Sequence, residues 1–142
     1  MKAAVLTNYD KNGRKLEIKE VEKPSPREKE VLVKVFTAAV NPLDNMIIRG
    51  EVKLIVPYSL PLIMGNEFAG QVEAVGSAVK HFKAGDRVYG RMPLSKIGAF
   101  AEYAAVEAGA LAPIPDYLSY DEAATVPLTA LTAVSYTHLT LP

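Results

Sequence analysis

The 142-residue chain contains no cysteine and no tryptophan, and it has only two histidines. Without cysteine there is no disulfide framework, no thiol nucleophile and no thiolate metal site. No apolar run approaches the ~20 residues that a membrane-spanning helix needs. The opening residues, MKAAVLTNYDKNGRKLE, also lack the apolar core of a secretory signal. We therefore expect no membrane partner and a cytoplasmic location.

An excess of charge of either sign is also absent, because 16 basic residues balance 16 acidic residues. No basic stripe is visible, so we expect no nucleic-acid partner. Hydrophobic residues make up 49% of the chain and charged residues 23%, which is typical of a globular protein. The length suits one domain with a sizeable core.

Short segments with strand character fill most of the chain. The strongest is EVLVKVFTAAVN, in which Val31, Val33 and Val35 share one face and Lys34 lies on the other. LEIKEVEKP alternates apolar and charged residues and predicts a half-buried strand. Further strands are expected within residues 2–7, 67–77, 86–91, 98–107 and 110–115. Frequent glycine and proline with little helix between the strands predicts a mainly β fold, either a barrel or a sandwich.

Two short helices can be placed by their capping residues. Asn41 is an N-cap candidate before Pro42, and Gly50 can end a helix near 42–49. Ser119 and Glu122 have the spacing of a capping box at the start of a second helix near 120–133. A proline at position 127 breaks or restarts that second helix.

The segment MGNEFAGQVEAVGSAVKHFKAGDRVYG, residues 64–90, has a strand pattern punctuated by Gly65, Gly70, Gly76 and Gly85. Their spacing and context differ from the dinucleotide-binding fingerprint, because no helix follows the first strand and no acidic residue stands at the required distance. We therefore interpret these glycines as sites of tight turns or close backbone approach, and we expect no phosphate-binding loop here.

Taken together, several segments resemble the catalytic domain of the medium-chain dehydrogenase/reductase superfamily. They are the segment 64–90 together with MKAAVLTNY, EVLVKVFTAAVNPLDNMIIRG, GAFAEYAAV and DEAATVPLTALTA, in this order from Met1 to about Ala133. The closest resemblance is to the zinc-independent quinone and enone oxidoreductases. It implies a partly open GroES-like β-barrel with short helices at residues 1–118, followed by a helical hinge at 119–133. In such enzymes a Rossmann domain that binds NADPH comes next, so the chain is expected to be part of a two-domain α/β enzyme.

The resemblance also bears on zinc. Zinc-dependent relatives carry a cysteine near the NPLD segment and a histidine within a GHE motif, but this chain has Asn66 in the motif GNE. Catalytic zinc needs three protein ligands, and neither His81 nor His138 has a cysteine or second histidine nearby. We therefore expect neither catalytic nor structural zinc.

The resemblance places Asn41 beside the nicotinamide ribose as the candidate catalytic and cofactor-binding residue, and the helix N-cap role is an equally good interpretation. Asn66, Thr129 and Thr132 are weaker candidates for the cofactor cleft. Met46 stands where some quinone reductases have a tyrosine. The candidates for a substrate pocket are Met46, Ile55 and Tyr58. The apolar segment 51–64, which contains Ile55 and Tyr58, is also explained by packing over the end of the barrel.

The last nine residues, VSYTHLTLP, change in character. They continue neither the helix nor an amphipathic pattern. Back-translated as GTC TCT TAT ACA CAT CTG ACG CTG CCG and preceded by CT, they resemble a transposon-end adapter of sequencing libraries. We therefore expect residues 134–142 to be a non-native tail, with a natural tail as the alternative.

The functional expectation follows from the resemblance. The complete protein is expected to be a homodimeric, NADPH-dependent oxidoreductase that reduces small quinones or α,β-unsaturated carbonyls by hydride transfer. The chain alone is expected to be inactive because it lacks the cofactor domain. The alternative is a stand-alone GroES-like binding or interaction module without catalysis.

Overall fold

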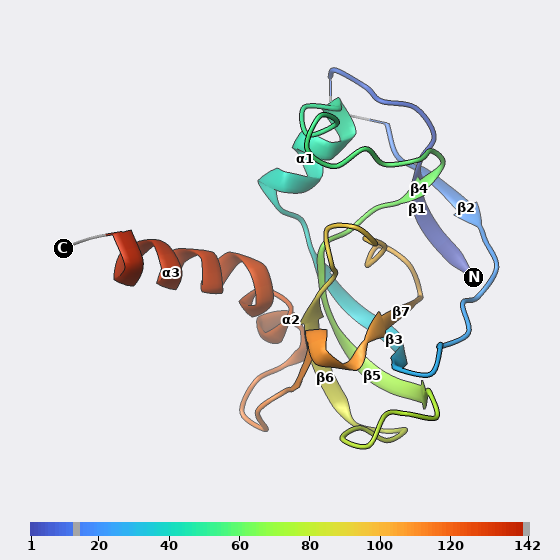
Figure 1. Ribbon diagram of the computed structural model, residues 1–142, viewed down its shortest axis with the longest axis vertical. Coiled ribbons are helices and arrows are strands. Elements are labelled where there is room, and N and C mark those ends of the chain that lie inside the picture. Colours follow the sequence, from blue (N-terminus) through green and yellow to red (C-terminus); the bar gives the residue numbers. More distant parts are fainter. Residues whose placement is uncertain (13–14, 141–142) are drawn as a thin grey trace.

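The computed structural model describes residues 1–12 and 15–140, and strands dominate it. A small antiparallel sheet has the order β2-β1-β4, formed by Glu17–Glu20, Lys2–Leu6 and Leu62–Ile63. A larger antiparallel sheet has the order β7-β3-β5-β6-β8, formed by Tyr103–Glu107, Glu30–Ala39, Glu67–Val75, Arg87–Arg91 and Leu111–Pro113. The sheets curve toward each other without closing into one barrel (Figure 1). This arrangement confirms the mainly β, partly open fold expected from the sequence.

The pairing of β3 with β5 forms the centre of the larger sheet. Its register sets Val33 opposite Val72 and Ala39 opposite Glu67, with irregularities next to Val33 and near Val35. The predicted inner face of β3 is correct for Val31 and Val33, which are completely buried. Together with residues of both sheets and of α1 (Pro42–Arg49), they form the main hydrophobic core, whose largest members include Leu6, Ile47, Met64, Phe68 and Val88.

The segment LEIKEVEKP forms a strand as predicted, β2, but its predicted half-burial is wrong. All four residues of β2 are exposed, and the Ile18 side chain is 72% exposed. The strand lies at the edge of the small sheet and pairs only with β1, so it has a neighbouring strand on one side alone. Leu16, just before the strand, packs against the core instead. The two-residue strand β4 was not predicted, because so short a pairing leaves no period in the sequence.

The first helix agrees with its capping signals. Helix α1 covers Pro42–Arg49, and Gly50 ends it in the left-handed conformation with φ of 76°. The predicted second helix is divided into α2 (Tyr120–Ala123), the π-helical turn η2 (Val126–Ala130) and α3 (Leu131–Thr140). The break falls around Pro127, as predicted. A short 3₁₀ turn, η1 (Ala108–Ala110), separates β7 from β8.

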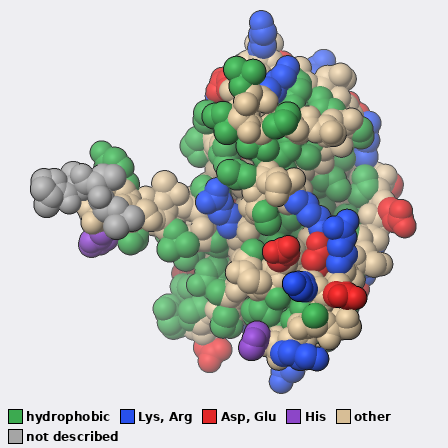
Figure 2. Space-filling model, viewed as in Figure 1, with side chains coloured by type: hydrophobic (Ala, Val, Ile, Leu, Met, Phe, Trp, Pro, Cys, Tyr) green, Lys and Arg blue, Asp and Glu red, His purple; other side chains and the backbone are tan. Residues whose placement is uncertain are grey.

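The expectation that residues 134–142 do not continue the helix is wrong as far as Thr140, and positions 141–142 lie outside the described residues. The segment from Leu131 to Thr140 contains neither glycine nor proline, so nothing interrupts the hydrogen-bond ladder once η2 has started it. The side chains of residues 131–138 are all exposed, which agrees with the missing amphipathic pattern. Figures 1 and 2 show α3 projecting from the body of the domain.

Within the described part of the chain, no helix combines the length and apolar character that crossing a membrane requires.

Candidate functional site

Four buried polar side chains gather between the start of α1 and the start of β5: Asn41, Asp44, Asn66 and Glu67. Asn41 and Asp44 lie at the N-terminal end of α1, while Asn66 and Glu67 lie at the start of β5. The strand register brings them together, because Ala39 at the end of β3 pairs with Glu67. Such a concentration of buried polar groups is unusual unless each is hydrogen-bonded.

Glu67 is completely buried and receives hydrogen bonds from three directions. The Asn41 Nδ2 donates to Glu67 Oε1 at 2.8 Å, and the Thr129 Oγ1 donates to the same oxygen at 3.1 Å. The backbone N–H of Leu128 donates to Glu67 Oε2 at 2.7 Å. The Thr129 hydroxyl also lies 2.7 Å from Asn41 Oδ1, so its single hydrogen is shared between these two acceptors, with the shorter contact to Asn41. Turn η2 is therefore joined to the start of α1 through one carboxylate.

Asp44 forms the second half of the cluster. Its carboxylate accepts from the Asn41 backbone N–H at 2.8 Å and from Asn66 Nδ2 at 2.7 Å. Burial raises the pKa of Asp44, the negative charge of Glu67 adds to this, and the two hydrogen bonds only partly oppose it. Among the described residues, Asn66 Oδ1 is the buried side-chain atom without a hydrogen-bond partner. The cluster thus keeps two carboxyl groups and one unsatisfied amide oxygen away from water.

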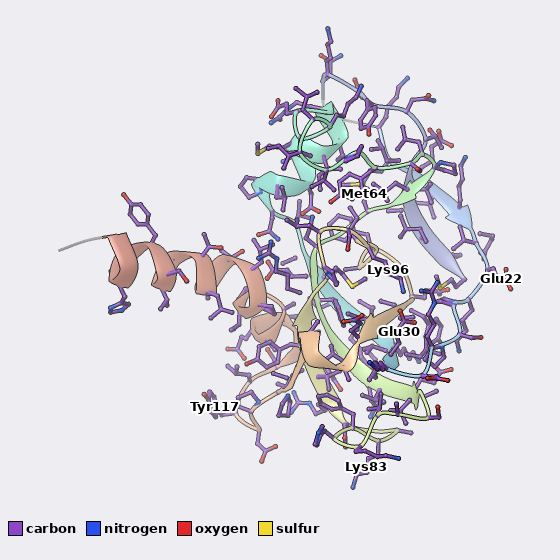
Figure 3. The ribbon with its side chains drawn as sticks, in the orientation of Figure 1. Glu22, Glu30, Met64, Lys83, Lys96 and Tyr117 are labelled. Atoms are coloured by element: carbon purple, nitrogen blue, oxygen red, sulfur yellow. The ribbon has the colours of Figure 1, made fainter. Side chains whose placement is uncertain are left out.

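The position of Asn66 depends on the glycine before it. Gly65 has φ of 105°, and a Cβ at this position would lie 2.5 Å from the backbone nitrogen of Phe100. Backbone hydrogen bonds from Gly98 and Ala99 to the Gly65 oxygen hold the segment in place. Completely buried Met64, labelled in Figure 3, anchors it on the other side. The interpretation of this glycine as a site of close backbone approach is therefore confirmed.

Asn41 and Met46 line an open cavity of about 520 Å³ together with Val40, Pro42, Asn45, Arg49 and Glu51. Thr132 lines a second cavity of about 440 Å³, between the end of β6 and helix α3. Thr129 connects the two regions through its bond to Asn41. Asn66 has no exposed surface and reaches the cluster only through Asp44, so this geometry gives it no direct contact with a cofactor.

The three residues proposed for a substrate pocket are not brought together. Met46 is 38% exposed at the first cavity, whereas Ile55 is 82% exposed on a turn outside that cavity. Tyr58 packs against the main core, and its hydroxyl donates to the Leu94 carbonyl oxygen at 2.6 Å. Burial raises the pKa of Tyr58, and the nearby Asp44 charge raises it further. Packing, the alternative interpretation of the segment 51–64, accounts for Tyr58.

The sequence did not single out the two acidic members of the site. Neither the place of Asp44 in the first turn of α1 nor that of Glu67 at the start of β5 marks its carboxyl group as a site residue. The available signal was the pair of motifs NPLD and GNE, in which an acid stands three residues after one candidate asparagine and directly after the other. What the pattern lacks is any indication that positions 44 and 67 meet.

The donor set does not suit zinc. The position of the GHE histidine is taken by Asn66, whose nitrogen is committed to Asp44. His81 and His138 are both exposed, on a loop and on α3 respectively. Among the residues described, no three histidine, cysteine or acidic side chains converge on a metal position. Zinc independence stays a prediction, and it rests on ligand chemistry.

Comparison with known proteins identifies related domains. The model of the alcohol dehydrogenase GroES-like domain matches residues 27–116. A chloroplastic quinone-oxidoreductase homolog of Spinacia oleracea is 36% identical over 133 residues, which are 94% of this chain and 40% of that protein. The chloroplastic NADPH-dependent alkenal/one oxidoreductase of Arabidopsis thaliana is 40% identical over 116 residues, which are 78% of this chain and 30% of that protein.

Solved structures give the same result. The chain superposes on Escherichia coli quinone oxidoreductase complexed with NADPH with a TM-score of 0.88 and 31% identity, covering 99% of this chain and 41% of that one. This match confirms the GroES-like fold. The chain spans 30% to 41% of the length of these curated relatives.

Proposed function

The chain belongs to the alcohol dehydrogenase GroES-like domain family of the medium-chain dehydrogenase/reductase superfamily, and on this premise we propose that it is the catalytic domain of an NADPH-dependent oxidoreductase. The proposed substrates are quinones and α,β-unsaturated carbonyls. The names of the relatives from Spinacia oleracea and Arabidopsis thaliana support this class of substrate. The complete enzyme requires a cofactor domain in addition to this chain.

The orientation of the Asn41 amide carries the proposal. Its nitrogen is held by buried Glu67, and its oxygen accepts from the Thr129 hydroxyl. An amide oxygen has two lone pairs, so Asn41 Oδ1 keeps the capacity to accept a second hydrogen bond, and the residue lines the first cavity. A ribose hydroxyl of a nicotinamide nucleotide is a donor that fits this acceptor. The donor and acceptor chemistry at Asn41 is therefore compatible with the proposed cofactor.

The remaining residues of the chain would hold and shield the reactants. Thr132 offers a hydroxyl at the second cavity, and Thr129 keeps Asn41 in place from turn η2. Val40 and Met46 give the first cavity an apolar wall, which suits a flat apolar acceptor and limits water. When bound, the nicotinamide supplies a hydride, which needs no protein nucleophile. The protein contributes binding, orientation and exclusion of water.

A reconstituted enzyme tests the proposal. On the proposal that residues 134–142 are non-native and a cofactor domain follows, the chain is joined at Ala133 to that domain, and oxidation of NADPH is followed with a benzoquinone and with an alkenal. We expect turnover with at least one acceptor that is unchanged by a metal chelator. Absence of turnover with both acceptors and with either NADPH or NADH would reject the enzyme and leave the binding module. Turnover that a chelator abolishes would reject zinc independence.

A further inference from the structure

We propose that Glu67 is a positioning residue, whose carboxylate determines which atom of the Asn41 amide faces the cofactor and anchors turn η2 beside it. This inference rests on the proposed function, because it concerns the same cofactor site. Glu67 itself is completely buried, so it acts through the groups that it contacts, which are Asn41, Thr129 and Leu128.

The chemistry of an ionised carboxylate makes this role specific, because it can only accept hydrogen bonds. Every group that faces Glu67 must therefore be a donor. The Asn41 amide has one donor end and one acceptor end, so its nitrogen turns to Glu67 and its oxygen turns to Thr129. Nitrogen and oxygen of an amide have almost the same size, so packing alone would not distinguish the two orientations.

The same carboxylate holds the other side of the site. Its second oxygen accepts from the backbone N–H of Leu128 at 2.7 Å. Leu128 follows Pro127 within the π-helical turn, where the regular helical ladder is interrupted. The side chains of Leu128 and Thr132 line the second cavity. One group on β5 thus sets both the amide at the first cavity and the turn at the second.

The nearly isosteric substitution Glu67→Gln separates charge from shape. Glutamine offers one oxygen and one NH₂ group, but the Leu128 N–H and Asn41 Nδ2 are both donors. If the glutamine oxygen accepts from Leu128, its nitrogen faces Asn41 and forces the amide to turn over. Asn41 would then present a donor in place of an acceptor, so a cofactor hydroxyl bound there would have to reverse its own hydrogen bond. If the glutamine turns the other way, Leu128 loses its partner.

Nuclear magnetic resonance of the chain itself tests this without a cofactor. In Glu67→Gln we expect the Asn41 side-chain amide signals to shift and exchange of the Leu128 amide hydrogen or of the Asn41 side chain to accelerate about tenfold. Amides of Ile47 and Ile48 in α1 should keep their shifts. Glu73→Gln, the same change at an exposed position of β5, is the matched control and should alter none of these signals. Unchanged Asn41 and Leu128 signals in Glu67→Gln would overturn the inference.

A double substitution covers the case in which Glu67→Gln does not fold. In Asn41→Asp combined with Glu67→Gln, the glutamine nitrogen can donate to the new carboxylate while its oxygen accepts from Leu128. Thr129 can still donate to position 41. We expect this exchanged pair to fold and to restore the slow exchange of Leu128. Two results would contradict the proposed pattern of donors and acceptors. In one, the Leu128 amide hydrogen of the double variant exchanges as fast as in Glu67→Gln; in the other, the double variant also does not fold.

Kinetics of the reconstituted enzyme provide the functional readout. Glu67→Gln should raise the KM for NADPH by about tenfold, measured well below its unfolding temperature, because a misplaced contact weakens cofactor binding. Glu73→Gln should leave the KM unchanged. An active enzyme with an unaltered KM in Glu67→Gln would overturn the positioning role alone. An unmutated enzyme without activity would reject the proposed function, whereas the resonance result on the chain would still report on Glu67.

Discussion

The side-chain nitrogen of Asn41 donates a 2.8 Å hydrogen bond to Oε1 of Glu67, which lies 26 residues further along the chain. Both residues are buried, with 3% and 0% of their surfaces exposed. The bond joins the beginning of α1 to the beginning of β5 and leaves the amide oxygen for Thr129 and the cavity. The cofactor contact that we propose therefore depends on an interaction inside the domain.

Replacement of Asn41 by alanine is expected to affect both stability and function. It removes one donor from a buried carboxylate, which should lower the free energy of unfolding by about 1–3 kcal/mol. In the reconstituted enzyme it should also lower turnover and weaken NADPH binding, because the acceptor oxygen is lost. Denaturant unfolding of the chain and steady-state kinetics of the enzyme measure the two effects separately.

Asn41→Ser is the matched control for this prediction. Serine is a good N-cap residue for the start of α1, but its side chain is too short to replace the amide contact with Glu67. We expect it to recover part of the stability and little of the cofactor affinity. Turnover and affinity equal to those of the unmutated enzyme would mean that Asn41 serves only the helix.

Gly65→Ala should be strongly destabilising. A Cβ would lie 2.5 Å from the backbone nitrogen of Phe100 in a conformation with φ of 105°. Conformational strain and the clash together should cost roughly 2–5 kcal/mol. Gly85→Ala is the control, because its φ of 96° is similar but no atom lies within 4 Å of the added Cβ. Urea unfolding should show a clearly larger loss for Gly65→Ala, and equal losses would contradict the role of the Phe100 contact.

The elements that the sequence predicted well are those with a local signal. Strand β3 shows its buried valines in the period of two, and α1 shows its start and its end in Asn41 and Gly50. The site depends on distant pairs instead, such as Thr129 and Glu67, which are 62 residues apart. A local sequence pattern cannot predict a contact between residues so far apart in the chain. The sequence predicted the break at Pro127. It did not predict that the resulting turn points the Leu128 N–H toward Glu67.

The ion pair between Lys96 and buried Glu30 should make stability depend on pH. The Lys96 Nζ and Glu30 Oε1 atoms lie 2.5 Å apart, and both residues are labelled in Figure 3. Burial raises the pKa of Glu30, but hydrogen bonds from Lys96 and from the Arg27 amide outweigh it and hold the pKa below its usual value. Because the folded-state pKa is lowered, this stabilisation is present above the unfolded pKa of about 4.3 and is lost as pH falls through the folded-state pKa.

Lys96→Met tests this dependence. The variant should unfold at a lower temperature than the unmutated chain at neutral pH, and the difference should shrink below about pH 4. Asp44, whose pKa is raised, contributes in the opposite sense, but it is present in both proteins and cancels in the difference. Lys83→Met, a change at an exposed lysine labelled in Figure 3, should show no such dependence. A difference that is constant from neutral to acidic pH would contradict the role of the pair.

Helix α3 should promote self-association of the isolated chain. Leu131, Val134 and Tyr136 are 54%, 52% and 66% exposed on it, and Figure 2 shows hydrophobic side chains along the projecting helix. Exposed apolar groups of this kind favour association. We expect sedimentation velocity to detect a species larger than the monomer at high concentration, and Leu131→Ser with Val134→Ser to reduce it. Ile18→Ser, at an exposed position of β2, should not; a monomer at all concentrations would contradict the prediction.

Transfer of deuterium from the nicotinamide tests the central claim most directly. The reconstituted enzyme is supplied with NADPH carrying deuterium at the transferable C4 position, an α,β-unsaturated ketone and a metal chelator. Mass spectrometry and nuclear magnetic resonance of the product then locate the label. The account predicts one deuterium at the former β-carbon. When unlabelled NADPH is used in heavy water instead, it predicts no deuterium at that carbon. A product without the label, or no product while the enzyme is folded and binds NADPH, would contradict it.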